Sequence, residues 1–159
     1  MTELTALHTR TFNTLRLNLA TLENIFQRVT AEQATTLRDG PNGWTPLEIL
    51  CHLRDFDVIF RERGELLLMA HNPTFAKYDA DQLASERAYN QQSIAAALAE
   101  LKQNRAQLLA FFESLPPEQW ARTGVHFRLG PFTMTDVFTH IAWHDANHLE
   151  QLTRVLAQT

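Results

Sequence analysis

The sequence predicts an all-α protein, a bundle of four long helices that forms a single domain over residues 1–159. Three observations predict this fold class. Apolar residues recur at alternating steps of three and four, the periodicity of a helix that packs lengthwise on its neighbours. Threonine caps followed by proline or acidic residues mark helix starts, and clusters of glycine, proline and asparagine mark helix ends. A chain of 159 residues can bury a proper core without disulfide or metal staples.

The first half of the chain predicts two of these helices. An apolar stripe runs through residues 2–29, and the polar segment 30–43 that follows ends in a run of turn formers, Asp39 to Gly43. Thr45 suits the N-cap of the second helix because a proline follows it and Glu48 stands where a capping box needs its returning arm. We expect the second helix to end near Ala70.

The second half predicts two more. A third helix should begin near residues 79–81 and run to Glu113, because a Pro-Pro pair soon afterwards cannot continue it. Residues 120–131 contain two glycines and a proline around a short apolar run, so we expect a long loop, with a small hairpin as the alternative. Thr133 then caps the fourth helix, with Asp136 near the positive end of its dipole.

Charge and composition exclude several classes of partner. The net charge is −4, the pI is near 5.9 and no block of lysine and arginine is present, which argues against nucleic acid or an anionic membrane surface. No uncharged apolar run approaches the roughly 18 residues of a membrane span, and the N-terminus does not have the pattern of a signal peptide. The single cysteine, Cys51, excludes an internal disulfide. We therefore expect a cytoplasmic protein with Cys51 as a buried core thiol.

The fourth helix carries the residues that indicate a function. His140, His144 and His148 follow one another at steps of four, and residues four apart lie on one helix face. Two neutral imidazoles at this spacing can bind one metal ion. The three cannot all reach one ion, because the helix rises about 12 Å over these residues and metal–nitrogen bonds are about 2.0–2.1 Å long. The pair is therefore His140 with His144, or His144 with His148.

A third ligand must then come from another helix. His52 is the one histidine that lies well inside another predicted long helix on its buried side. Three histidines with one open position are what metal catalysis needs, whereas a closed structural zinc site would require paired cysteines that this chain lacks. On the residues alone, interior histidines that only hydrogen-bond remain the alternative.

The sequence resembles the DinB-like, or DinB/YfiT, superfamily over most of its length. The resemblance rests on four motifs: Gly43-Trp44-Thr45-Pro46 followed by Cys51-His52-Leu53, the Asn72-Pro73 connection, the Gly130-Pro131 approach to the last helix, and the closing run from Trp143 to Gln151 with its His-x-x-x-His pair. It implies an up-down-down-up bundle and a divalent metal held by His52, His144 and His148. His140 is then a neighbour of the site.

The resemblance also implies a function. Family members with assigned chemistry include transferases and isomerases that use low-molecular-weight thiols such as bacillithiol or mycothiol. The leading expectation is therefore a metal-dependent S-transferase, or a related hydrolase or isomerase, that acts on a small-molecule substrate. Zinc or nickel is expected because imidazole suits both ions. The alternative is a non-catalytic metal-binding or stress-response bundle, and a homodimer is possible for either.

Neighbouring polar residues allow two readings. Asp145, Asn147 and Gln151 could orient a ligand imidazole by accepting its free N–H, but a solvated helix face explains Asp145 and Asn147 equally well. Trp143 is expected to pack at the end of the bundle or to form a wall of the site. Surface ion pairing is expected for three charged residues of the second helix, Arg54, Asp57 and Arg61.

Overall fold

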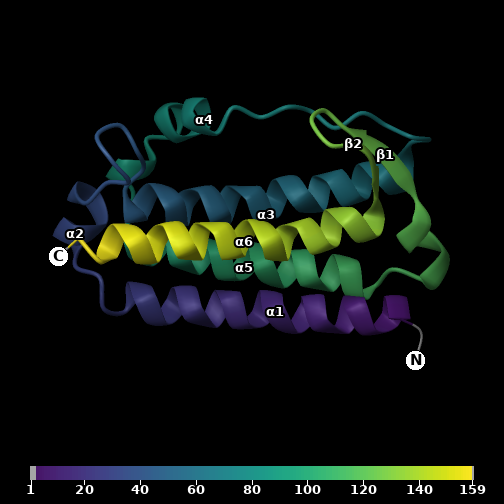
Figure 1. Ribbon diagram of the computed structural model, residues 1–159, viewed down its shortest axis with the longest axis horizontal. Helices are drawn as coiled ribbons and strands as arrows, with labels where there is room; N and C mark the ends of the chain where they lie inside the picture. The colour runs from purple at the N-terminus through teal and green to yellow at the C-terminus, as the bar shows by residue number, and fades with distance from the viewer. Residues whose placement is uncertain (1–2, 159) are drawn as a thin grey trace.

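Four long helices form the body of the protein, whose computed structural model describes residues 3–158. The four are α1 (Glu3–Phe26), α3 (Pro46–Met69), α5 (Ile94–Glu113) and α6 (Met134–Leu156). Figure 1 shows that α1 and α6 run in one direction and that α3 and α5 run in the other. This is the up-down-down-up bundle that the resemblance to the DinB-like superfamily implies.

The helices that carry the site begin where the sequence places them. At the start of α3 the Thr45 hydroxyl accepts the backbone N–H of Glu48 at 3.2 Å, and the Glu48 carboxylate accepts the backbone N–H of Thr45 at 2.8 Å. Thr133 and Asp136 form the same reciprocal pair at the start of α6, at 3.0 and 2.8 Å. These capping boxes satisfy orphan donors of the first turn, so they fix the first residue of both helices.

Because the consecutive helices α3 and α5 are parallel, the chain between them returns along the whole length of the bundle (Figure 1). This segment contains α4 (Ala80–Glu86) and the 3-10 turn η1 (Tyr89–Gln91). The predicted single helix from residues 79–81 to Glu113 is therefore wrong. Ala88 adopts a positive φ of 47°, which an α-helix does not allow, and the buried Tyr89 donates its hydroxyl to a carboxylate of α3. A tertiary contact overrides the helical pattern here.

Two further details differ from a simple chain of four helices. A short helix, α2 (Ala31–Thr36), occupies part of the segment 30–43, and Thr30 and Gln33 cap it with a capping box of their own. The alternative of a hairpin before the last helix is confirmed. After the 3-10 turn η2 (Pro117–Ala121), strands β1 (Thr123–His126) and β2 (Gly130–Thr133) pair antiparallel.

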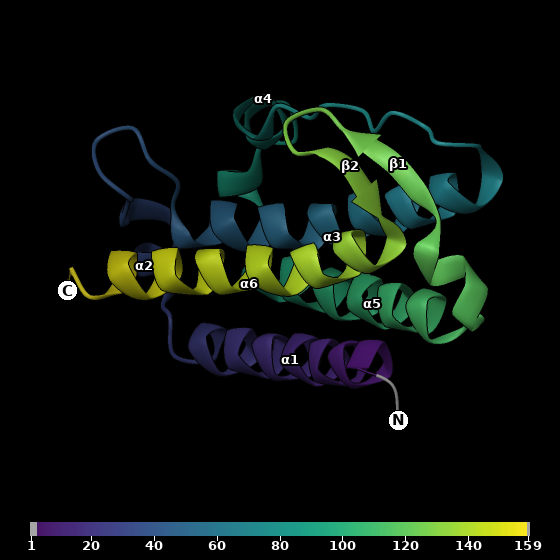
Figure 2. The ribbon, with the colours of Figure 1, turned by 45° about the vertical axis from the view of Figure 1, so that its right-hand side comes forward.

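The hairpin is fastened to the crossover segment between α3 and α4. The backbone N–H of Phe75 donates to the carbonyl of Val125 at 2.9 Å, and the N–H of Val125 donates to the carbonyl of Pro73 at 2.8 Å. Gly124 allows this close approach, since a Cβ there would lie 2.8 Å from the Pro73 carbonyl oxygen. The hairpin and α4 lie on the same side of the bundle, opposite α1 (Figures 1 and 2).

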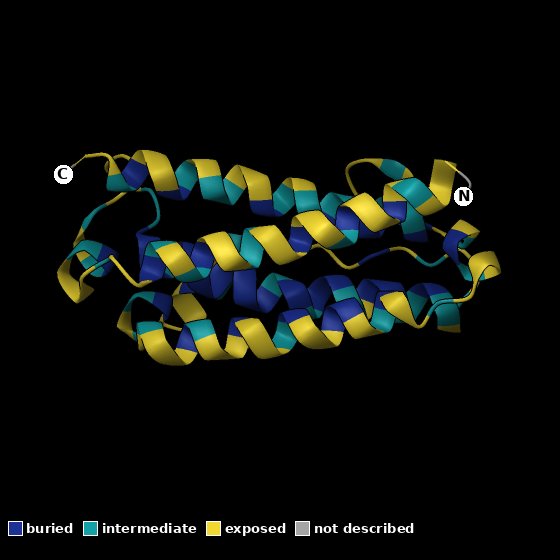
Figure 3. Cartoon of the chain, turned by 90° about the horizontal axis from the view of Figure 1, so that it is seen from below, coloured by how far each residue is buried: buried dark blue, intermediate teal, exposed yellow. Residues whose placement is uncertain are grey.

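The core consists of two apolar clusters that follow one another along the bundle. In Figure 3 the buried faces of the long helices turn inward and the exposed faces outward. One cluster contains Leu53 of α3 and Leu101 of α5, and the other contains Phe60 and Leu108 of the same two helices. Between these levels the helices bring charged and polar side chains into the interior. None of the helices within residues 3–158 is both long and apolar enough to cross a membrane.

Candidate metal centre

Three imidazoles from two helices converge at the middle of the bundle. His52 projects from α3, and His144 and His148 project from successive turns of α6. The Nε2 atom of His52 lies 2.9 Å from the Nε2 atom of His144, and one ring nitrogen from each of the three histidines lies within 4.8 Å of the others. The two helices thus place three potential ligand atoms around one point.

These separations fit a single ion. Two nitrogens that bind one ion at about 2.0–2.1 Å lie about 3–3.5 Å apart, depending on the angle between the bonds. The His52 and His144 nitrogens are already this close, at 2.9 Å, and a ring nitrogen of His148 lies within 4.8 Å of both. Three protein ligands leave at least one position of a tetrahedral ion for another molecule.

The protonation state also fits ligation. Burial lowers the pKa of all three imidazoles, well below the ordinary value for His52 and His144, and the positive charge of a neighbouring histidine lowers those two further. The three rings are therefore neutral at pH 7 and keep a lone pair for a metal. In addition, Nδ1 of the buried His52 has no hydrogen-bond partner in the described part of the chain. Internal hydrogen bonds alone therefore do not explain why this polar ring is buried.

Gln151 orients His148, as the sequence suggests. Its amide oxygen lies 2.8 Å from Nδ1 of His148 and accepts the hydrogen there, which leaves the Nε2 lone pair free. The Gln151 amide nitrogen in turn donates to the Asp39 carboxylate at 2.9 Å. Asn147 instead donates to the carbonyl of Trp143 on the exposed face of α6, so the solvated reading is right for Asn147.

Both readings of Asp145 are wrong, and so is the surface placement of Asp57. Asp145 is 1% exposed, and the guanidinium of Arg105, which is fully buried, binds it at 2.7 and 3.0 Å. The same guanidinium binds Asp57 at 2.8 and 3.0 Å. Burial raises the pKa of Asp57 to about 6, because it outweighs the opposing effect of Arg105. The buried network joins α3, α5 and α6 beside the histidines.

Surface ion pairing was also expected for Arg54 and Arg61 of α3, and the structure places these two residues differently. Arg54 is buried rather than on the surface, and it donates to Asp55 at 2.7 Å and to Glu100 at 3.0 Å. Arg61 forms the expected surface pair, with Glu65 one helical turn later at 3.0 Å. Only Arg61 therefore behaves as the sequence predicts.

Aromatic rings surround the imidazoles. The ring centroid of Trp44 lies 4.7 Å from that of His52, and the Trp44 indole N–H donates to Asp81 at 2.9 Å. Phe56 lies 4.1 Å from His52 and 5.1 Å from His144. Trp44 thus packs against the candidate ligands as well as at the end of the bundle. These rings keep water away from two sides of the histidines.

A cavity of about 220 Å³ opens beside His144. Phe56 and Phe60 of α3 form one wall of it, and His140 and Trp143 of α6 form another. Trp143 lines this cavity and is 61% exposed, so it forms a wall as in the second of its two expected places and is not packed in the core. His140 belongs to the cavity and not to the group of three converging imidazoles.

The hairpin adds residues to this cavity that have no signal in the sequence. They are His126 together with the exposed Phe127, Arg128 and Leu129. Nδ1 of His126 accepts the backbone N–H groups of Arg128 at 3.3 Å and Leu129 at 3.2 Å, so its proton resides on Nε2. His126 has no metal-like spacing to any other histidine, and only the fold brings it to His140.

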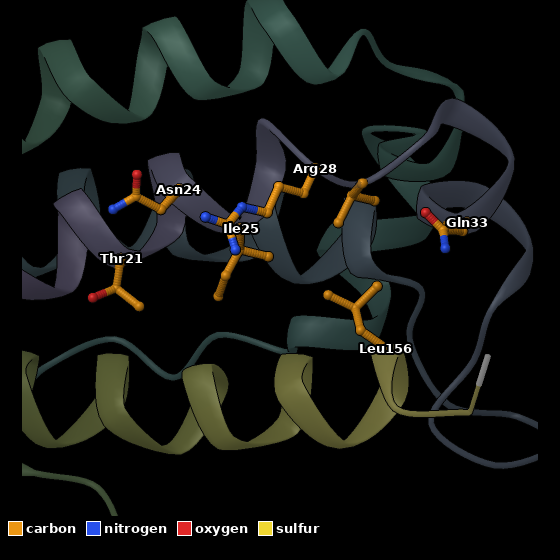
Figure 4. Close-up of a pocket in the computed structure, with 7 residues that line it drawn as sticks. Thr21, Asn24, Ile25, Arg28, Gln33 and Leu156 are labelled. Atoms are coloured by element: carbon orange, nitrogen blue, oxygen red, sulfur yellow. The ribbon is translucent and has the colours of Figure 1, made fainter.

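A second cavity, of about 480 Å³, lies between α1, α2 and the last turn of α6 (Figure 4). Its lining contains no histidine, cysteine or carboxylate: it consists of Thr21, Asn24, Ile25, Arg28, Val29, Gln33 and Leu156. It offers no imidazole or thiolate for a transition metal and no side chain that transfers a proton at neutral pH. The chemistry of the described residues therefore points to the histidines.

Fold and site together define a helical-bundle protein with a candidate metal centre formed by three histidines. The chain belongs to the DinB superfamily, whose family model matches residues 14–152. This confirms the resemblance seen in the sequence.

Two similar proteins extend the comparison. A protein of Oceanobacillus iheyensis with the name "Putative metal-dependent hydrolase" is 27% identical over 119 residues, which cover 75% of this chain and 67% of that protein. The solved structure of YfiT from Bacillus subtilis is described as that of "a probable metal-dependent hydrolase with an unusual four-helix bundle topology". It matches with a TM-score of 0.85 and 22% identity over 95% of this chain and 86% of that chain. At this identity the likeness to YfiT establishes the fold.

Proposed function

We propose that this protein is a metal-dependent hydrolase that holds one divalent ion between His52, His144 and His148. The observation that carries the proposal is the convergence of three neutral imidazoles from two helices next to a cavity that can admit a small molecule. The names of the two similar proteins support the same reaction class. Zinc and nickel are the first candidates because both accept imidazole ligands.

When bound, such an ion acts as a Lewis acid and lowers the pKa of a water or thiol in its open position. The protein's own residues supply orientation. Gln151 fixes His148 with Nε2 toward the site, and the pairing of Arg105 with Asp57 and Asp145 holds α3 and α6 in register. Trp44 and Phe56 exclude bulk water from the imidazoles, which strengthens electrostatic interactions there.

Two histidines of the cavity can hold or move a proton. Burial lowers the pKa of both His126 and His140, so both rings are neutral at pH 7. The proton of His126 is on Nε2, because backbone N–H groups occupy its Nδ1. Nε2–H is thus a hydrogen-bond donor for a substrate oxygen in the cavity.

Thiol-dependent S-transfer is the second candidate, in which the sulfur of a low-molecular-weight thiol takes the open position. The chain supplies no thiolate of its own, because burial raises the pKa of its one cysteine, Cys51, to about 12. The Cys51 sulfur also lies 3.9 Å from the carbonyl oxygen of Tyr89, within the core. An S-transferase with this site must therefore receive its thiol from solution.

The test compares reactions on protein loaded with zinc or with nickel. Small carboxylic esters, amides and phosphate esters are assayed alone, and an aryl halide is assayed with and without added low-molecular-weight thiols. We expect turnover of one hydrolytic substrate class, lost in His144→Ala and retained in His71→Ala, an exposed histidine away from the site. Turnover only with an added thiol supports the S-transferase. Full metal binding without turnover of any substrate supports the non-catalytic alternative.

A further inference from the structure

Arg63 is a buried cation that has no counter-ion among the residues that the structure describes. It lies on α3 with 7% of its surface exposed, and it lines the cavity next to His144. Within residues 3–158 no aspartate or glutamate forms an ion pair with it, and its Nε has no hydrogen-bond partner. A guanidinium carries five N–H donors and stays charged at neutral pH, so leaving it unpaired in the interior is costly.

Two phenyl rings hold this guanidinium in place. Its Cζ atom lies 5.5 Å from the ring centroid of Phe60 and 5.7 Å from that of Phe75. The rings attract the positive charge, but they do not replace acceptor oxygens for the N–H groups. Arg63 is therefore positioned by the protein while its donors remain available.

The whole cavity shares this positive character. Its lining contains a second arginine, the exposed Arg128, and no aspartate or glutamate. After burial, the charge of Arg63 is one of the causes that lower the pKa of His126 and His140. The cavity is thus positive in a protein with a net charge of −4.

We propose that this cavity binds the carboxylate or phosphate group of a small anionic substrate through the guanidinium of Arg63. The proposal rests on the proposed function, because it assigns a substrate class to the same site. A carboxylate or phosphate can accept two parallel N–H bonds from an arginine, which matches the donors that Arg63 leaves unused.

Phe60 relates the anion to the candidate metal centre. Its ring centroid is 5.3 Å from that of His144 and 5.5 Å from Cζ of Arg63, so one aromatic ring contacts both the imidazole and the guanidinium. If the anionic group of a substrate binds Arg63, a second group of the same molecule, separated from the anion by about the width of one aromatic ring, would lie beside the histidines. The cavity of about 220 Å³ limits this substrate to a compact molecule.

The test uses three probes that share a phenyl ring: benzoate, its neutral isostere benzamide, and phenyl phosphate. Binding to the full chain is measured by calorimetry or by NMR shifts, first after removal of metal with a chelator and then with one equivalent of zinc. The metal-free arm excludes binding of the anion directly to an ion. It also separates the two proposals, because anion binding is read there without any metal.

We expect benzoate or phenyl phosphate to bind at least about tenfold more tightly than benzamide, as a charge-assisted pair provides. Arg63→Met should remove this preference, and Arg63→Lys should keep part of it. Arg61→Gln is the matched control, two residues away on the same helix and paired with Glu65 at the surface, and it should bind like the wild type. The stronger of the two anions then shows which group the cavity prefers.

Equal binding of benzamide and both anions to the wild type would overturn the proposal, and this comparison does not depend on any variant folding. An anion preference that survives in Arg63→Met, with helicity intact by circular dichroism, would overturn it as well. If the anions bind but zinc does not, the proposed metal function fails and the anion site stands. If zinc binds and the anions bind no more tightly than benzamide, the anion site fails and the proposed metal function stands.

Discussion

The guanidinium of Arg105 on α5 donates a hydrogen bond of 2.7 Å to Asp145, the residue that directly follows His144 on α6. It also binds Asp57, which lies five residues after His52 on α3. A single buried arginine therefore fixes both helices that carry the converging imidazoles. The relative placement of His52 and His144 depends on this interior charge network as well as on apolar packing.

Removing Arg105 should destabilise the protein strongly. Arg105→Ala leaves the carboxylates of Asp57 and Asp145 buried beside each other without a counter-ion, and breaking such a network costs about 3–5 kcal/mol. Arg16→Ala removes an exposed pair with Glu113 and should cost about 0–1 kcal/mol. Urea unfolding of both variants measures the difference. Equal losses for the two would show that the network does not hold the helices.

Gln151 should affect metal affinity without being a ligand. Gln151→Ala removes the acceptor for Nδ1–H of His148, and loss of such a partner typically lowers metal affinity about 10–100-fold. Asn147→Ala is the matched control on the same helix, because Asn147 is exposed and donates to the carbonyl of Trp143 rather than to an imidazole. Competition with a chromogenic chelator measures both affinities. An unchanged affinity in Gln151→Ala would place His148 outside the metal centre.

His140 should matter less for metal binding than His144. The His140 ring belongs to the cavity, whereas His144 contributes a nitrogen to the cluster of three. We expect His144→Ala to lose most of its bound metal and His140→Ala to keep most of it, with similar helicity in both. Metal content after dialysis provides the comparison. Equal losses would indicate that the ligand pair on α6 is His140 with His144.

The metal-free protein should lose stability in mild acid. The pKa values of His52, His144 and His148 are lowered from 6.5 in the folded state, so the unfolded chain binds protons more readily than the folded chain. The stability that depends on neutral imidazoles is therefore complete above pH 6.5 and decreases as the pH falls through the lower folded values. Each histidine contributes a slope of up to about 1.4 kcal/mol per pH unit.

Urea unfolding between pH 5 and pH 8 measures this dependence, and His144→Leu should flatten it because one of the buried bases is gone. A free energy of unfolding that stays constant from pH 8 to pH 5 would mean that these rings can take up protons in the folded state. The three imidazoles would then not lie in a buried environment that lowers their pKa values.

The parts of the fold and of the candidate site that the sequence predicts are those that depend on residues close together in the chain. The capping boxes at Thr45 and Thr133 are local patterns, and the spacing of His144 and His148 is a local property of a helix, so all were visible. Adding His52 to the pair needed the resemblance to a family, because His52 and His144 are about 90 residues apart in the chain. The fold brings one ring nitrogen of each of the three histidines within 4.8 Å of the others, and their role as ligands stays a prediction.

Other features could not be read because they exist only in the folded chain. Nothing near Asp57 or Asp145 in the sequence indicates that Arg105 will lie between them. Asp57 was therefore expected at the surface, and Asp145 either on a solvated helix face or beside a ligand imidazole. The break at Ala88 follows from the anchoring of Tyr89 on α3. Arg63 looked like one more charge on a helix until the fold placed it in a cavity without acidic residues.

The central claim is that imidazoles from α3 and α6 share one metal ion, and metal content tests it most directly. Protein purified without an affinity tag is incubated with excess zinc or nickel, dialysed and analysed for bound metal, beside His52→Ala and the control His71→Ala. We expect about one equivalent in the wild type and in His71→Ala, and a strong loss in His52→Ala with helicity retained. Less than about a tenth of an equivalent in the wild type, or full occupancy in His52→Ala, would contradict the claim.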